Sequence, residues 1–62
     1  MKQNYEYPYL VKLYKNGVLI QKYHYRDVTD IQTDMYGLKS EYTYKVIDML
    51  NQKDITKKVQ MV

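Results

Sequence analysis

The segment YLVKLYKNGVLIQKYHY, residues 9–25, decides the fold of this chain. At its centre stands Asn16-Gly17, the preferred filling of a two-residue type I′ turn, in which both central residues need positive φ. The runs on either side, 9–15 and 18–26, are rich in Tyr, Val, Leu and Ile, which favour strands. The segment therefore predicts a β-hairpin.

The turn sets the predicted register of this hairpin. Three cross-strand pairs follow, namely Lys15 with Val18, Leu13 with Ile20 and Val11 with Lys22. One face of the sheet would carry Tyr9, Val11, Leu13 and Ile20, and the other Leu10, Tyr14, Leu19, Tyr23 and Tyr25. Both faces are substantially apolar, whereas a sheet with one solvated face shows one polar side. We therefore expect a helix to cover one face and a second subunit or another partner to cover the other.

Residues 27–37, DVTDIQTDMYG, predict a short helix. Thr29 followed three residues later by Gln32 forms a capping-box pattern, which places the N-cap at Thr29. Gly37 supplies the C-terminal stop, because glycine readily adopts the left-handed conformation that ends many helices.

The same segment is an acidic island in a basic chain. The net charge of the chain is +3, yet residues 27–38 hold no Lys or Arg. Three carboxylates lie there: Asp27, Asp30 and Asp34. Ile31 and Met35 share one face of the predicted helix, and Tyr36 follows them. Carboxylates beside an apolar patch suit a partner protein whose own site is basic with an apolar projection, although a merely soluble helix face explains the same acids.

The rest of the chain completes a ββαβ order. Residues 41–50 alternate loosely and predict a third strand. Residues 51–62 form either a flexible tail or a short fourth strand at 59–62. The predicted fold is a single α+β domain over residues 1–62, with a three-stranded antiparallel sheet and one short helix.

The length of the chain favours association with a second copy. A domain of 62 residues buries only about 60% of the surface that its unfolded chain exposes, so its core is thin. Small domains compensate with disulfides, a structural metal or oligomerisation, and this chain has no Cys for a disulfide or a thiolate zinc site. All nine aromatic residues are Tyr, whose apolar ring and polar tip suit half-buried strands and interfaces. We therefore expect a homodimer.

The inventory of reactive side chains argues against catalysis. Cys is absent, and one Ser (Ser40) and one His (His24) lie in a predicted turn and a predicted strand, with no pattern that brings them together. We expect no enzyme activity, no cofactor and no metal site. The chain shows neither a signal-peptide pattern nor about 18 consecutive apolar residues, so we expect a cytoplasmic protein.

Two other functions are compatible with the sequence. Basic, tyrosine-rich strands can bind single-stranded nucleic acid through stacking and phosphate contacts. The candidates for such contacts are Lys12, Tyr14, Tyr23 and Tyr25. The Gly-aromatic signature of an RRM and a dense Lys/Arg cluster are both absent, which counts against this function. A structural or assembly protein, in turn, needs only apolar sheet faces that associate.

The order of these features resembles a known family. A strand, an Asn-Gly hairpin, a Tyr-rich strand with Tyr23-His24, an acidic helix ending in Tyr36-Gly37 and a final strand are similar to the small uracil-DNA glycosylase inhibitors of Bacillus podophages. The likeness covers roughly residues 9–50. Members of that family are ββαβ homodimers that imitate DNA. Their dimer surface holds a hydrophobic pocket for the leucine loop with which glycosylases enter DNA, and acidic groups stand where phosphates would lie.

The resemblance implies a partner-binding site on the predicted helix. The residues that would line the leucine-binding pocket across the dimer axis are Tyr25, Ile31, Met35 and Tyr36. Asp30 and Asp34 would face the phosphate-binding elements of the enzyme, and Gln32 falls near a position that is acidic in the family. The partner would be a uracil-DNA glycosylase in the cytoplasm of an infected host, blocked by competition with DNA. This function involves neither a membrane nor nucleic acid.

Overall fold

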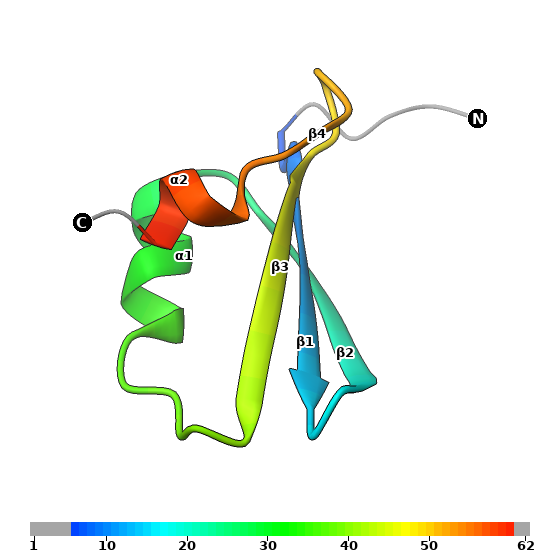
Figure 1. The fold of residues 1–62 in the computed structure, drawn as a ribbon. Coiled ribbons are helices and arrows are strands. Elements are labelled where there is room, and N and C mark those ends of the chain that lie inside the picture. The colour runs from blue at the N-terminus through cyan, green and yellow to red at the C-terminus, as the bar shows by residue number, and fades with distance from the viewer. Residues whose placement is uncertain (1–5, 61–62) are drawn as a thin grey trace.

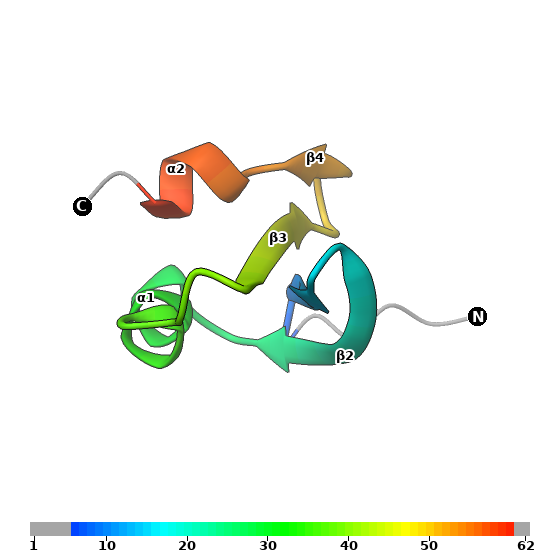
Figure 2. The same ribbon diagram turned by 60° about the horizontal axis from the view of Figure 1, so that its bottom comes forward.

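Residues 6–60 are described by a computed structural model, and they form an α+β domain. In chain order the elements are β1 (Tyr9–Lys15), β2 (Val18–Tyr25), α1 (Val28–Met35), β3 (Tyr42–Asp48), β4 (Lys53–Asp54) and α2 (Thr56–Gln60). The strands form one antiparallel sheet in the order β2-β1-β3-β4. Both helices lie on the same side of this sheet, and no described element covers its other side (Figure 1, Figure 2).

The predicted hairpin and its turn are confirmed. Asn16 and Gly17 both have positive φ, 51° and 83°, as a type I′ turn requires. Lys15 pairs with Val18 next to the turn, in the predicted register. The backbone N–H of Asn16 also donates to the carbonyl oxygen of Glu41 (2.8 Å), which ties the turn to the chain entering β3.

A bulge in β2 changes the register beyond the turn. Tyr14 pairs with Leu19, but the preceding residue of β1, Leu13, pairs with Gln21. Ile20 is the extra residue between these two pairs, so the predicted pairing of Ile20 with Leu13 is wrong.

The bulge moves the rest of β2 to the opposite face of the sheet from the predicted one. Val11 pairs with Tyr23 and Tyr9 with Tyr25, so the predicted pairing of Val11 with Lys22 is also wrong. Residues paired across antiparallel strands share a face. Tyr23 and Tyr25 therefore lie on the helix side of the sheet, where their rings meet edge to face with centroids 6.3 Å apart.

The core lies between this side of the sheet and the two helices. Its fully buried side chains are Val11 of β1, Ile31 of α1, Val46 of β3 and Val59 of α2. Partly buried side chains pack around them: Tyr9, Tyr25, Val28, Met35, Tyr44 and Ile55. Because each of four elements supplies one fully buried side chain, removal of any one of these elements would open the core to water.

Helix α1 begins earlier than the capping-box pattern predicts. Its N-cap is Asp27, no side chain caps the helix, and Thr29 lies within the first turn. The amide of Gln32 donates instead to the carbonyl oxygen of Val59 (2.9 Å), which joins α1 to α2. The predicted stop is present, since Gly37 has a φ of 78° just after the helix.

The C-terminal segment contains a short fourth strand, one of the two forms predicted for it, but this strand lies at Lys53–Asp54, and Val59 and Gln60 of the predicted stretch 59–62 lie in a helix. Within the described residues it forms β4 and α2, so the fold has a four-stranded sheet and two helices; residues 61–62 lie outside the described part. Asp54 accepts hydrogen bonds from the backbone N–H and the hydroxyl of Thr56, and these bonds hold the pKa of its carboxyl below the usual value. The Thr56 hydroxyl oxygen accepts a bond from the N–H of Val46 (2.9 Å), which fixes the start of α2 against β3.

The fully buried Ile31 provides a test of this core. Ile31→Ala should lower the free energy of unfolding by about 2–5 kcal/mol, because it removes apolar contacts and leaves a cavity. Leu50→Ala, at a side chain that is 47% exposed, should change it by about 0.5 kcal/mol or less. Urea unfolding followed by circular dichroism measures both. Equal losses in the two variants would contradict the core described here.

Candidate functional site

The most exposed large apolar side chain among the described residues is Tyr36, at the C-terminal end of α1. It is 90% exposed, whereas the next most exposed, Val18, is 63% exposed. The backbone of Tyr36 is extended (φ −64°, ψ 131°), so the chain leaves the helix at this residue. A tyrosine that projects its ring into water is a common anchor of protein interfaces, because its ring has a large area and few rotatable bonds.

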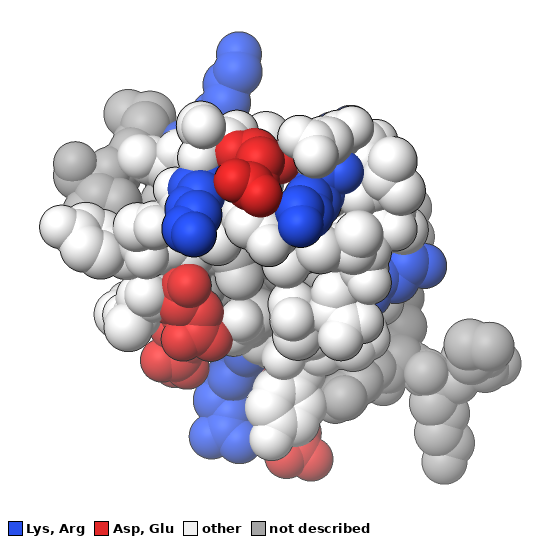
Figure 3. Space-filling model, turned by 90° about the horizontal axis from the view of Figure 1, so that it is seen from below, with Lys and Arg blue, Asp and Glu red and all other residues white. Residues whose placement is uncertain are grey.

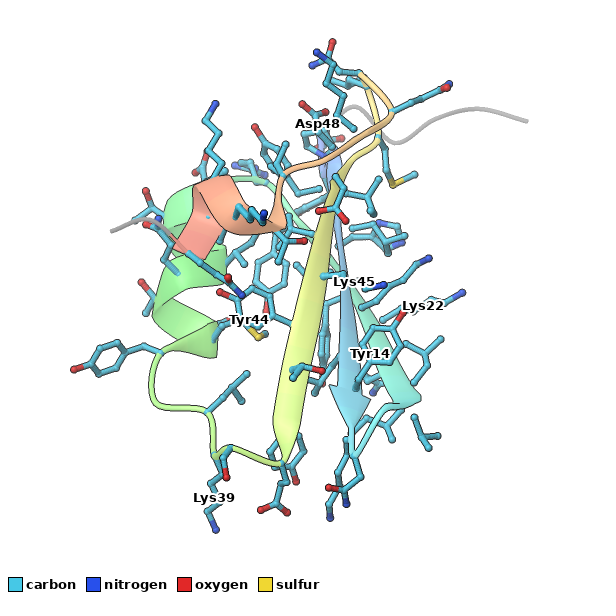
Figure 4. The ribbon with its side chains drawn as sticks, in the orientation of Figure 1. Tyr14, Lys22, Lys39, Tyr44, Lys45 and Asp48 are labelled. Carbon is cyan, nitrogen blue, oxygen red and sulfur yellow. The ribbon has the colours of Figure 1, made fainter. Side chains whose placement is uncertain are left out.

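Tyr36 borders a hollow with a largely apolar lining. The other side chains of this hollow are Met35 of α1, Tyr44 of β3, Val59 and Gln60 of α2, and Gln32 of α1. Its volume is about 280 Å³, which accommodates a branched aliphatic side chain. Tyr44 points from β3 toward α1 (Figure 4) and so contributes to this hollow from the sheet. A second, open depression of about 610 Å³ adjoins Tyr36 on the side of Thr29 and Thr33.

The two predicted acids of the site, Asp30 and Asp34, are both exposed on α1. Viewed from the end of the molecule that holds the β1–β2 turn, acidic and basic side chains alternate over the surface, and part of the acidic surface lies on the left, the side of α1 in Figure 1 (Figure 3). Asp34 Oδ2 accepts a hydrogen bond from the phenol of Tyr25 (2.8 Å), which links the end of β2 to α1. Burial, and then this bond to a carboxylate, raise the pKa of Tyr25 to about 12.

The structure divides the predicted site residues into two groups. Asp30, Asp34 and Tyr36 are exposed, although one carboxylate oxygen of Asp34 already accepts the bond from Tyr25, and Met35 is partly buried at the edge of the hollow. The other three are engaged within the domain: Ile31 is fully buried, Gln32 bonds Val59, and Tyr25 bonds Asp34. The apolar lining that Ile31 was expected to give comes instead from Tyr44 together with Met35, while Val59 lies at the floor of the hollow as a fully buried core residue.

Neither Tyr44 nor Val59 was among the residues predicted for the site. The alternation of Tyr42, Tyr44 and Val46 in β3 was the available signal for Tyr44, because it places these side chains on one face of a strand. Val59 gave no comparable signal, since α2 has only five residues.

The structure separates the residues that were candidates for nucleic-acid binding. Tyr23 and Tyr25 lie on the helix side of the sheet, whereas Lys12 and Tyr14 lie on the open side. The single platform formed by all four residues, which the predicted register implied, is therefore absent from the described structure.

Other functional features are sparse in the described part of the chain. Among residues 6–60, His, Asp and Glu form no group of three or more that could hold a metal ion. His24 pairs with Leu10 on the open side of the sheet, and Ser40 lies between α1 and β3. Neither of the helices in this range is long and apolar enough to cross a bilayer. Comparison of the chain with protein-family models, with curated proteins and with solved structures finds no match.

The bond between Tyr25 and Asp34 predicts a stability change at high pH. The folded state raises the pKa of Tyr25 to about 12, so it binds this proton more tightly than the unfolded chain does. The resulting stabilisation is complete below the unfolded pKa of about 10 and is lost as the pH rises toward 12. Urea unfolding at pH values from 8 to about 11.5 should show this loss in the wild type.

Tyr25→Phe is the control for this prediction, because it keeps the ring and removes the titrating group. The variant should lose less stability than the wild type over the same alkaline range, and Asp34→Asn should behave similarly but less strongly. An identical alkaline loss in the wild type and Tyr25→Phe would show that another group causes it.

Proposed function

We propose that this protein is a phage-type inhibitor that binds a host DNA-processing enzyme, namely a uracil-DNA glycosylase, at the enzyme's DNA-binding groove. The observation that carries the proposal is Tyr36, an almost fully exposed anchor beside an apolar hollow and on the same helix as two exposed carboxylates. The two carboxylates form a negatively charged surface that complements a basic, phosphate-binding groove. The hollow can bind an apolar side chain that projects from that groove. The site of action would be the host cytoplasm.

In this mechanism the inhibitor competes with DNA without catalysing any reaction. An apolar loop residue of the enzyme would enter the hollow between Met35 and Tyr44, and the ring of Tyr36 would shield it from water. Asp30 and Asp34 would take the places of DNA phosphates. The negative charges on the helix would slow association with acidic proteins and favour a basic partner.

We further propose that the protein acts as a homodimer. The buried core of the described residues consists of four side chains, which is small for an independent domain. Val18 and Ile20 are 63% and 48% exposed at the hairpin end of β2, which is an edge strand of the sheet. An edge strand with exposed aliphatic side chains favours pairing with another chain.

Uracil excision by a bacterial uracil-DNA glycosylase tests the inhibitor proposal. Near-stoichiometric inhibition by the wild type, with co-elution of the two proteins on size exclusion, is the expected result. Tyr36→Ala should weaken inhibition about thirtyfold or more, the loss typical of an interface hot spot, and should leave the unfolding free energy nearly unchanged.

The matched control is Tyr7→Ala, since Tyr7 is also exposed (38%) but lies before β1. This variant should inhibit as well as the wild type does. Full glycosylase activity in the presence of excess wild-type protein, or unchanged inhibition by Tyr36→Ala, would refute the proposal.

Light scattering coupled to size exclusion tests the dimer. The wild type should elute with the mass of two chains, and Ile20→Lys should shift it toward one, because a two-fold interface would bring two introduced charges together. Ile20→Val, which keeps an aliphatic side chain, should remain dimeric. A monomeric wild type, or a dimer unaffected by Ile20→Lys, would exclude association through this edge.

A further inference from the structure

Three lysines form a row across the open side of the sheet. Lys12 of β1 pairs with Lys22 of β2 on one side and with Lys45 of β3 on the other. Paired residues of antiparallel strands share a face, and neighbouring strands lie about 4.8 Å apart, so the three ammonium groups project from one narrow band. Lys22 and Lys45 point away from the helices, into solvent (Figure 4).

This row is unfavourable for folding by itself. Like charges that face each other directly across strands destabilise a sheet, and here the arrangement occurs in two adjacent pairs. Within residues 6–60 the three lysines form no ion pair; the ion pair found there joins Lys15 to Glu41 (3.8 Å). Asp54 lies at the edge of the same face, opposite Ile47, where it is bonded to Thr56 and its charge interacts with Lys45; no such acid is found beside Lys12 or Lys22 among the described ion pairs. An anionic ligand would remove the repulsion within the row.

The rows on either side of the lysines can contact bases. On the hairpin side Tyr14 lies between Leu19 and Thr43, and its ring has Lys45 Nζ 5.8 Å from its centroid. On the other side Leu10 lies between His24 of β2 and Ile47 of β3. Tyrosine and histidine rings both stack on unpaired bases, and aliphatic side chains add apolar contact.

The shape of this face distinguishes between possible anionic ligands. A duplex is read by an element that enters a groove, such as a helix or a projecting two-stranded ribbon, whereas the open face is the surface of a four-stranded sheet with no described element projecting from it (Figure 2). An open antiparallel sheet with helices behind it is instead the arrangement on which single strands are laid out with their bases on aromatic rings. An acidic peptide would use the lysines but leave the ring of Tyr14 unused.

We propose that the open face of the sheet is a binding site for single-stranded nucleic acid. Lys12, Lys22 and Lys45 contact successive phosphates, and Tyr14 and His24 stack on bases beside them. The site is distinct from the inhibitor surface, because it lies on the opposite side of the sheet and shares no residue with it.

Fluorescence anisotropy of a labelled oligothymidylate of about 12 nucleotides tests this site. The triple variant Lys12→Gln, Lys22→Gln, Lys45→Gln should bind about tenfold or more weakly at low salt. Its slope of log affinity against log salt should be smaller by about 2, since each neutralised phosphate of a single strand contributes about 0.7. Tyr14→Ala should weaken binding without changing this slope. Both variants should still inhibit the glycosylase as the wild type does.

The matched control is the triple variant Lys39→Gln, Lys53→Gln, Lys57→Gln. These three lysines lie outside the row and are exposed. The control lowers the net charge by the same amount and should bind the oligonucleotide almost as the wild type does. The proposal would be overturned if the two triple variants lost equal affinity for the oligonucleotide, or if the wild type did not bind it. It would also be overturned if the wild type bound polyglutamate or a DNA duplex as tightly as the single strand.

Discussion

The extra residue in β2 determines what each side of the sheet presents. If β2 paired with β1 without the bulge at Ile20, Lys22 would face Val11 and its ammonium group would lie beside the core, where burial of an unpaired charge is costly. The bulge instead turns Lys22 to the open side and brings Tyr25 to the helix side, where it bonds Asp34. The position of α1, and with it the exposed end at Tyr36, depends on this arrangement.

The second constraint is the small core, which α2 completes. Val59 is the fully buried side chain of this helix, and the helix is held at its start by Thr56 and along its length by the amide of Gln32. The same helix closes one wall of the hollow beside Tyr36. Stability and the candidate binding site therefore depend on the same short segment, so substitutions within α2 would alter both together.

The fold was predictable where local chemistry decides it. Asn16-Gly17 can adopt positive φ and Gly37 ends a helix, and both features are present. The bulge was not predictable, because Ile20 carries no local mark of an irregular strand; the choice of register depends on which side chains the helices bury. Helix α2 was missed because five residues with one buried apolar side chain give no periodic signal. The same division holds for the candidate site, since Asp30, Asp34 and Tyr36 follow from one helix, whereas Tyr44 and Val59 come from elements distant in the sequence.

The net charge of +3 is an average over two surfaces of different character. The exposed acids of α1 lie on one side of the sheet, and the row formed by Lys12, Lys22 and Lys45 lies on the other. Salt screens charges over about 8–10 Å, so a partner that approaches α1 experiences its carboxylates, together with the neighbouring Lys57 and Lys58 of α2, and little of the lysine row on the other side. A basic chain can in this way present an acidic surface, because the local arrangement of charges, and not their sum, determines which partner each side of the sheet attracts.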